Sequence, residues 1–194
     1  MQAQQLMAQD RKIVEEAYAG DIIGVFDPGI FSIGDTLCSS SEKFEFEGIP
    51  TFAPEHFARV RQVDTMKRKQ FLKGMEQIAQ EGAIQIFKTP YTGMEEVIVG
   101  VVGTLQFDVL EYRLKNEYNV ELYMEGLPYE YLRWIETDDG EPVKEEDLIL
   151  GTDVKLVEDY KGNQLLLFGS QWAIGWTEER NKNLTFHEFG GTKF

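Results

Sequence analysis

The stretch that most limits how this chain can fold lies in its middle, over residues 55–136. Apolar residues there alternate between a two-residue spacing, typical of strands, and a three- to four-residue spacing, typical of helices. The resulting order is strand–helix–strand followed by strand–helix–strand. Because such a βαββαβ unit buries its apolar surface by laying two helices on one face of a sheet, we expect an α+β sandwich.

Both helices of this unit carry start and stop signals. Asp64 and Thr104 are expected to cap their N-termini, because their side-chain oxygens can accept hydrogen bonds from first-turn amides. Gly82 and Asn119 are expected to end them, since both residue types tolerate the left-handed backbone of a helix C-terminus.

The segment before this unit reads as part of a β-barrel. Short β-prone runs at 12–18, 22–26, 33–37 and 44–46 are separated by turn residues, and a proline-containing linker follows at 49–54. About fifty residues are few for a closed barrel. We therefore expect a partial β-barrel over 1–51 and a second domain over 55–194. An unpaired barrel edge tends to recruit other chains, so self-association is also expected.

The last third of the chain extends the second domain. Residues 137–147 form an acidic loop, and a hairpin (155–160 and 164–168), a helix capped by Ser170 and a final strand (184–189) follow. This hairpin–helix–strand extension contains large aromatic residues. We expect Trp134, Trp172 and Trp176, with Phe168 and Phe186, to fill its core.

Charge is unevenly distributed along the chain. The net charge is −15, yet residues 56–88 contain seven basic and three acidic residues. A local basic surface on an acidic protein indicates a polyanionic partner bound at one place. We expect a single exposed face that contacts RNA phosphates, formed by Arg59, Arg61, Lys67, Lys69 and Lys73. The alternative is a merely solvated helix face.

Several chemistries lack support in the sequence. Gly29 and Gly34 have the spacing of a phosphate-binding loop, but Asp35 follows where the mechanism needs a lysine. His56 and His187 are isolated from other metal ligands. No apolar run reaches the ~18–20 residues of a membrane span, and the single Cys38 suits a reducing, cytoplasmic setting. We therefore expect no catalytic, cofactor-binding or metal-binding residue and no membrane partner.

Two groups of segments resemble known translation factors. Residues 17–24 and 33–37 are similar to the second half of the β-barrel that follows the GTPase domain in these proteins. The remaining segments resemble the bacterial class-II peptide chain release factor family, release factor 3, and lie at 48–55, 67–74, 81–87, 100–109 and 113–120. The resemblance is close over about 7–136 and looser beyond.

The resemblance implies a function for a longer protein. The family is a ribosome-dependent GTPase that removes class-I release factors from the ribosome after the peptide is released. GTP or GDP and magnesium would bind its GTPase domain, which this chain lacks. The chain would then correspond to part of the second domain plus the third domain. These domains would seat the factor on the RNA and protein of the small ribosomal subunit, without catalysis by this fragment.

Two other functions stay open at this stage. A sandwich of this layout often binds metabolites at sheet edges, so the chain could be a small-molecule-binding regulatory domain. It could also be an enzyme that uses the acidic loop and His187, which would require carboxylates with raised pKa values in one cleft.

Overall fold

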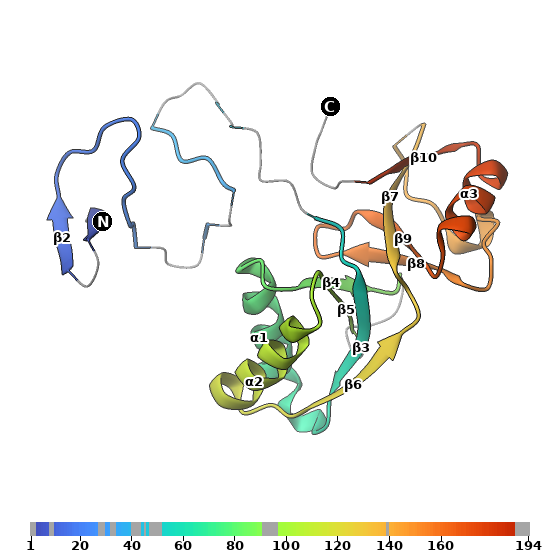
Figure 1. The fold of residues 1–194 in the computed structure, drawn as a ribbon, viewed down its shortest axis with the longest axis horizontal. Helices are drawn as coiled ribbons and strands as arrows, with labels where there is room; N and C mark the ends of the chain where they lie inside the picture. Colours follow the sequence, from blue (N-terminus) through green and yellow to red (C-terminus); the bar gives the residue numbers. More distant parts are fainter. Residues whose placement is uncertain are drawn as a thin grey trace.

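The computed structural model describes residues 3–7, 10–26, 30–31, 34–39, 44, 46, 52–90, 97–138 and 140–188. Its main element is an eight-stranded sheet in which all hydrogen-bonded neighbours are antiparallel (Figure 1). The strand order is β10–β7–β9–β8–β4–β5–β3–β6. The strands are β3 (His56–Gln62), β4 (Gln85–Lys88), β5 (Val97–Val101), β6 (Leu122–Leu127), β7 (Tyr131–Thr137), β8 (Val154–Asp159), β9 (Gln164–Phe168) and β10 (Leu184–His187).

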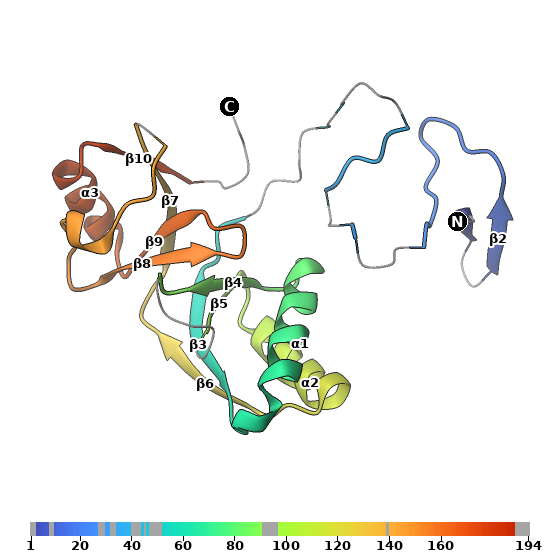
Figure 2. The ribbon, with the colours of Figure 1, turned by 180° about the vertical axis from the view of Figure 1, so that it is seen from behind.

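Three α-helices accompany this sheet. Helix α1 (Arg68–Gln80) follows a short 3-10 turn, η1 (Thr65–Lys67), and packs beside α2 (Leu105–Tyr118). Figures 1 and 2 show both helices together on the side of β3, β4 and β5, while α3 (Gln171–Arg180) lies at the other end beside β7–β10. A second 3-10 turn, η2 (Glu145–Asp147), lies in the acidic loop. The predicted α+β class, with its βαββαβ order, is confirmed.

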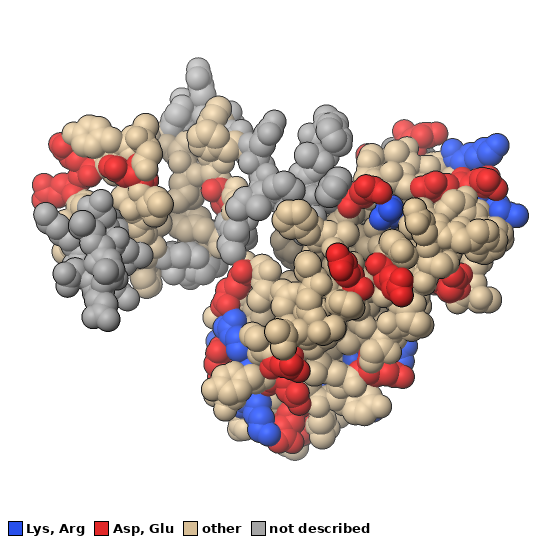
Figure 3. Space-filling model, viewed as in Figure 1, with Lys and Arg blue, Asp and Glu red and all other residues tan. Residues whose placement is uncertain are grey.

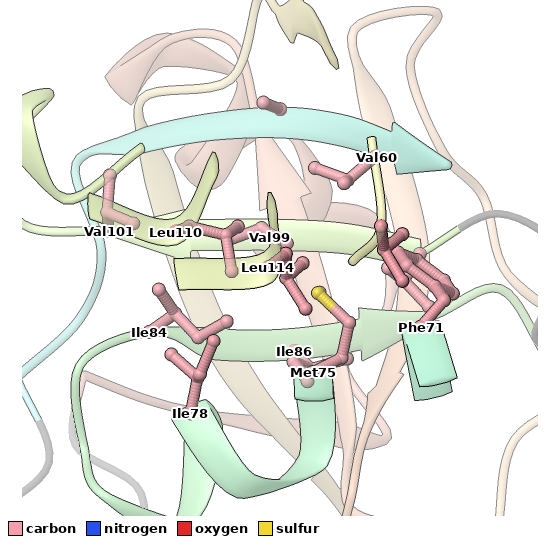
Figure 4. Packing of buried hydrophobic residues seen from close by; sticks show 13 residues of the cluster. Val60, Phe71, Met75, Ile78, Ile84, Ile86, Val99, Val101, Leu110 and Leu114 are labelled. Carbon is pink, nitrogen blue, oxygen red and sulfur yellow. The ribbon is translucent and has the colours of Figure 1, made fainter. Parts of the chain in front are cut away.

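The two helices are held to the sheet by one apolar cluster. Phe71, Met75 and Ile78 of α1 and Leu110 and Leu114 of α2 are fully buried against the strands (Figure 4). Their three- to four-residue spacing places them on one side of each helix. The strands contribute alternate residues, because successive side chains of a strand point to opposite faces.

The other face of the sheet forms an inner core because the sheet curls. Strand β6, at one edge of the sheet, is joined to β7, next to the other edge, by residues 128–130 alone. Five strands separate β6 from β7 in the sheet order, so this short connection could not reach from one to the other in a flat sheet. Side chains from six strands fill this concave face, among them Phe87, Leu132 and Val157. Helix α3 covers the convex face of β8 and β9 through Ala173 and Ile174.

Three of the four predicted caps are confirmed. Asp64 accepts a hydrogen bond from the Met66 amide at 2.9 Å and so caps η1, the turn that leads into α1. Gly82 and Asn119 have positive φ angles of 74° and 55°. The prediction for Thr104 is wrong, because its backbone is already helical and its side chain caps nothing. Gln106 replaces it: Oε1 accepts from the amides of Val102 and Gly103, at 2.9 Å each.

The strands predicted before residue 51 are mostly not formed in the part of this segment that the structure describes. The first predicted strand, 12–18, is observed two residues earlier as β2 (Asp10–Val14), which pairs with β1 (Ala3–Met7). Among the described residues of 22–26, 34–37 and 44–46, Gly24 forms a single bridge and none belongs to a strand, whereas residues 33 and 45 lie outside the described ranges. A strand needs a paired neighbour along its length, and a single bridge does not provide one. The domain boundaries and the open barrel edge stay predictions.

The prediction for the tryptophans is only partly right. Trp134 is buried in the inner core, but Trp172 is 72% exposed. Ala173, Ile174 and Thr177 occupy the buried side of α3, so Trp172 falls on the other side of the helix. A short helix offers few inward positions, and Ala173, Ile174 and Thr177 occupy them here.

Helices α1 and α2 approach most closely at Gly74. A Cβ atom there would lie 2.9 Å from Cγ of Tyr118 and closer still to Cδ2 of Leu114, which is fully buried. Gly175 in α3 is the opposite case, since a Cβ atom would meet nothing within 4 Å.

We expect opposite effects from alanine at these two glycines. Gly74→Ala should lower the free energy of unfolding by about 1–2 kcal/mol, because overcrowding outweighs the gain in helix propensity. Gly175→Ala should raise it by up to about 1 kcal/mol, because only the propensity gain applies. Urea unfolding of both variants measures this, and a stabilised Gly74→Ala variant would contradict the close approach.

Arg113 connects the end of α1 to α2. Its guanidinium donates to Glu117 at 2.8 and 2.9 Å and also to Glu81. These hydrogen bonds hold the pKa values of the Glu81 and Glu117 carboxyls below their usual range.

The lowered pKa values predict a pH dependence. Stability from these pairs is present above the ordinary glutamate pKa of 4.5 and is lost as the pH falls below it. The variant Arg113→Met should therefore be less stable than the parent at pH 7, and the difference should shrink toward pH 3. Thermal unfolding at both pH values tests this. An equal difference at both would show that Arg113 acts only through packing.

Candidate nucleic-acid interface

Helix α1 presents a basic outer surface. Lys69 and Lys73 are exposed, one turn apart, on the side opposite the buried Phe71 and Met75. The apolar residues hold the helix against the sheet, so the lysines necessarily face away from it. Lys67 precedes the helix and is half-buried.

The first turn of α1 has an unusual charge. Lys67, Arg68 and Lys69 are consecutive, and no acidic residue lies in this turn. Because the N-terminus of a helix carries partial positive charge, cations there are unfavourable by about 0.3–1 kcal/mol each at low salt. Lys67, Lys69 and Lys73 form no ion pair with any residue that the structure describes. An anionic partner would relieve this accumulation of positive charge.

The two predicted arginines lie elsewhere. Ala58 and Val60 point under the helices, so strand alternation turns Arg59 and Arg61 to the concave face. There the β3–β6 register pairs Arg59 with Glu125, at 3.4 Å, and lets Arg61 stack on the Tyr123 ring, 4.6 Å from its centroid. The expectation that all five basic residues share one face is therefore wrong.

The basic surface of α1 also contains a residue that the predicted set of five did not include. Arg68 is exposed and belongs to the same turn as Lys67 and Lys69. The three consecutive basic residues at 67–69 are the sequence pattern from which this residue could have been predicted. On the face in Figure 3, acidic and basic side chains are interspersed.

The other residues that the sequence analysis considered are His187 and the segment around Gly34 and Asp35. His187 lies 3.6 Å from Glu136 on the neighbouring strand. Within the described ranges, no three His, Cys, Asp or Glu side chains gather as a metal site would require. Gly34 precedes Asp35, and the described residues 34–39 form no helix, while Gly29, the other glycine of this loop, lies outside the described residues.

An open cavity of about 940 Å³ lies where the curled sheet brings β3 and β7 together. Phe57, Leu127 and Tyr129 line it with charged groups of both signs, Glu130 and Arg133. Burial raises the pKa of the Tyr129 phenol. The cavity is the place where the alternative of a small-molecule-binding domain would apply.

No helix in the described part of the chain is long and apolar enough to cross a bilayer.

Comparison with known proteins identifies relatives. The family model for the C-terminal domain of the class II release factor RF3 matches residues 46–178, and that for elongation factor G domain 2 matches residues 1–40. Peptide chain release factor 3 of Symbiobacterium thermophilum is 53% identical over 185 residues, which are 95% of this chain and 34% of the relative.

Other relatives have the same name and similar coverage. Peptide chain release factor 3 of Gloeobacter violaceus is 44% identical over 94% of this chain and 34% of its own length. That of Listeria welshimeri is 46% identical over 93% of this chain and 33% of its own length. The chain thus spans about a third of the length of the curated relatives it matches. It belongs to the class II release factor RF3 family.

Proposed function

We propose that this chain is the ribosome-docking C-terminal region of a translation-termination GTPase that recycles class-I release factors. In this proposal the chain itself is non-catalytic and acts in the cytoplasm. Residues 1–51 belong to a translation-factor β-barrel and residues 55–194 to the third domain. GTP or GDP and magnesium bind a GTPase domain outside this chain.

The observation that carries the docking proposal is the basic first turn of α1. Lys67, Arg68, Lys69 and Lys73 concentrate positive charge at the positive end of a helix in a protein of net charge −15. Phosphates of ribosomal RNA are the anions this turn would contact. Acidic residues elsewhere would repel RNA and so orient the docked protein. Arg59 and Arg61, which already contact Glu125 and Tyr123, are assigned a weaker role.

Reversing the two outer lysines tests this contact. Lys69→Glu with Lys73→Glu should weaken ribosome binding of a full-length factor containing this region. The slope of log affinity against log salt should also fall by about 1–2 units, since about one unit is lost per phosphate contact. Stability should change by only a few tenths of a kcal/mol, because charges on an exposed helix surface contribute little. Co-sedimentation across a salt series and thermal unfolding measure both effects.

A matched control separates charge from position. Lys144→Glu with Lys182→Glu makes the same change in net charge at two exposed sites outside α1. This control should keep the parent affinity and salt slope. If the α1 double variant also keeps them, its lysines are only solvated. If that variant unfolds, they are structural.

The chain alone should not bind GTP. Asp35 stands where a phosphate-binding lysine would be needed, so ~1 mM Mg–GTP should leave the melting temperature unchanged. Isothermal calorimetry provides the second measurement. Micromolar binding in that experiment would overturn the assignment of GTP binding to a region outside this chain.

A further inference from the structure

Helix α3 carries a ladder of two tryptophans and one arginine, in which Trp172 is exposed and Trp176 half-buried. The ring centroids of Trp172 and Trp176 are 6.4 Å apart, and the Arg180 guanidinium lies 4.0 Å from the centroid of Trp176. The three residues are spaced by four, so they share one side of the helix. Trp172 ends the ladder with 72% of its surface exposed.

This ladder differs from scattered surface apolar residues. A single exposed apolar residue is ordinary, but burying a tryptophan is among the most stabilising choices a core can make. Here the small residues Ala173 and Thr177 are buried and the large rings are not. Tryptophan and arginine are also the residue types most enriched where partners bind tightly.

The surface beside Trp172 is open and acidic. Gly175 follows one turn later, and a Cβ atom there would meet nothing within 4 Å. Glu179 lies one further turn along the same stripe, with 82% of its side chain exposed, and its carboxylate is 4.0 Å from the Arg180 guanidinium. A long cationic side chain could therefore lie across Gly175, with its head near Glu179 and its stem or guanidinium on the Trp172 ring.

The neighbouring loop adds more negative charge. Residues 137–147 contain six acidic residues and one basic residue, Lys144. This loop is tied to α3, because Nδ2 of Asn181 donates to the Ile149 carbonyl and its Oδ1 accepts from the Ile149 amide, both at 2.9 Å. Leu148 and Leu150 pack into the cluster that contains Ala173 and Ile174. Such surroundings repel a nucleic acid and attract a cationic protein segment.

We propose that the Trp172–Gly175–Glu179 stripe of α3 is a docking surface for an arginine-bearing segment of a partner protein. An arginine side chain stacks on Trp172, and its charge is balanced by Glu179 and the acidic loop. Arginine suits the site better than lysine because its planar guanidinium stacks on aromatic faces. The proposal goes beyond the RNA contact on α1 and depends on different residues.

The test uses a short synthetic peptide of alternating arginine and glycine, with its lysine counterpart and a single-stranded RNA oligonucleotide for comparison. The indole N–H signal of Trp172 in ¹H–¹⁵N spectra and tryptophan fluorescence report binding. The arginine peptide should shift the Trp172 signal and bind more tightly than the lysine peptide. Trp172→Ala should weaken binding of the arginine peptide about fivefold.

Two further variants separate docking from folding. Gly175→Gln should fill the open surface and weaken binding while raising the melting temperature, because glutamine is a better helix former than glycine. Tyr112→Ala removes an equally exposed aromatic residue from α2 and should change neither the peptide affinity nor the Trp172 signal.

Three results would overturn the proposal. One is unchanged affinity in both Trp172→Ala and Gly175→Gln. Another is a stronger response of the Trp172 signal to the RNA oligonucleotide than to the arginine peptide. The third is loss of the peptide response in a full-length factor, since another part of that factor would then cover α3.

Discussion

The close contact between α1 and α2 at Gly74 is the constraint on which the candidate interface depends. Gly74 lets Leu114 and Tyr118 approach the α1 backbone, and Tyr118 donates a hydrogen bond to Oε1 of Gln77 at 2.7 Å. With α2 in this place, Phe71 and Met75 can be fully buried. The rotation of α1 about its axis is then determined by packing, and the outward direction of Lys69 and Lys73 follows from it.

The curl of the sheet separates the remaining surfaces. Its convex face carries α1 and α2 at one end and α3 at the other, while the concave face holds a second core and, at its edge, Arg59 and Arg61. Two buried side-chain amides attach the acidic loop to the sheet and to the end of α3. Gln164 exchanges two hydrogen bonds of 2.7 Å with the Val143 backbone, and Asn181 exchanges two of 2.9 Å with the Ile149 backbone. Because both amides are paired, burying them carries little cost.

These features give the domain two surfaces of opposite character. The first turn of α1 gathers basic residues and holds no acidic one, whereas α3 carries the exposed ring of Trp172 on an outer side that also holds Glu179. Neither arrangement stabilises the protein when it is alone, because like charges repel each other and an exposed ring gains no free energy from burial. A factor that docks between RNA and basic protein would use both surfaces at once.

The sequence by itself determined the βαββαβ order, the caps at Asp64, Gly82 and Asn119, and the basic run on α1, because these depend on local spacing and backbone preference. The curl of the sheet, the pairing of Arg59 with Glu125 and the exposure of Trp172 were decided only in the tertiary structure. Each depends on partners distant in the chain: β3 meets β6 across more than sixty residues, as Arg59 and Glu125 show with a separation of 66. Local patterns cannot specify which distant strands pair with each other. The β3–β6 pairing gave Arg59 and Arg61 partners on the concave face, away from the lysines of α1.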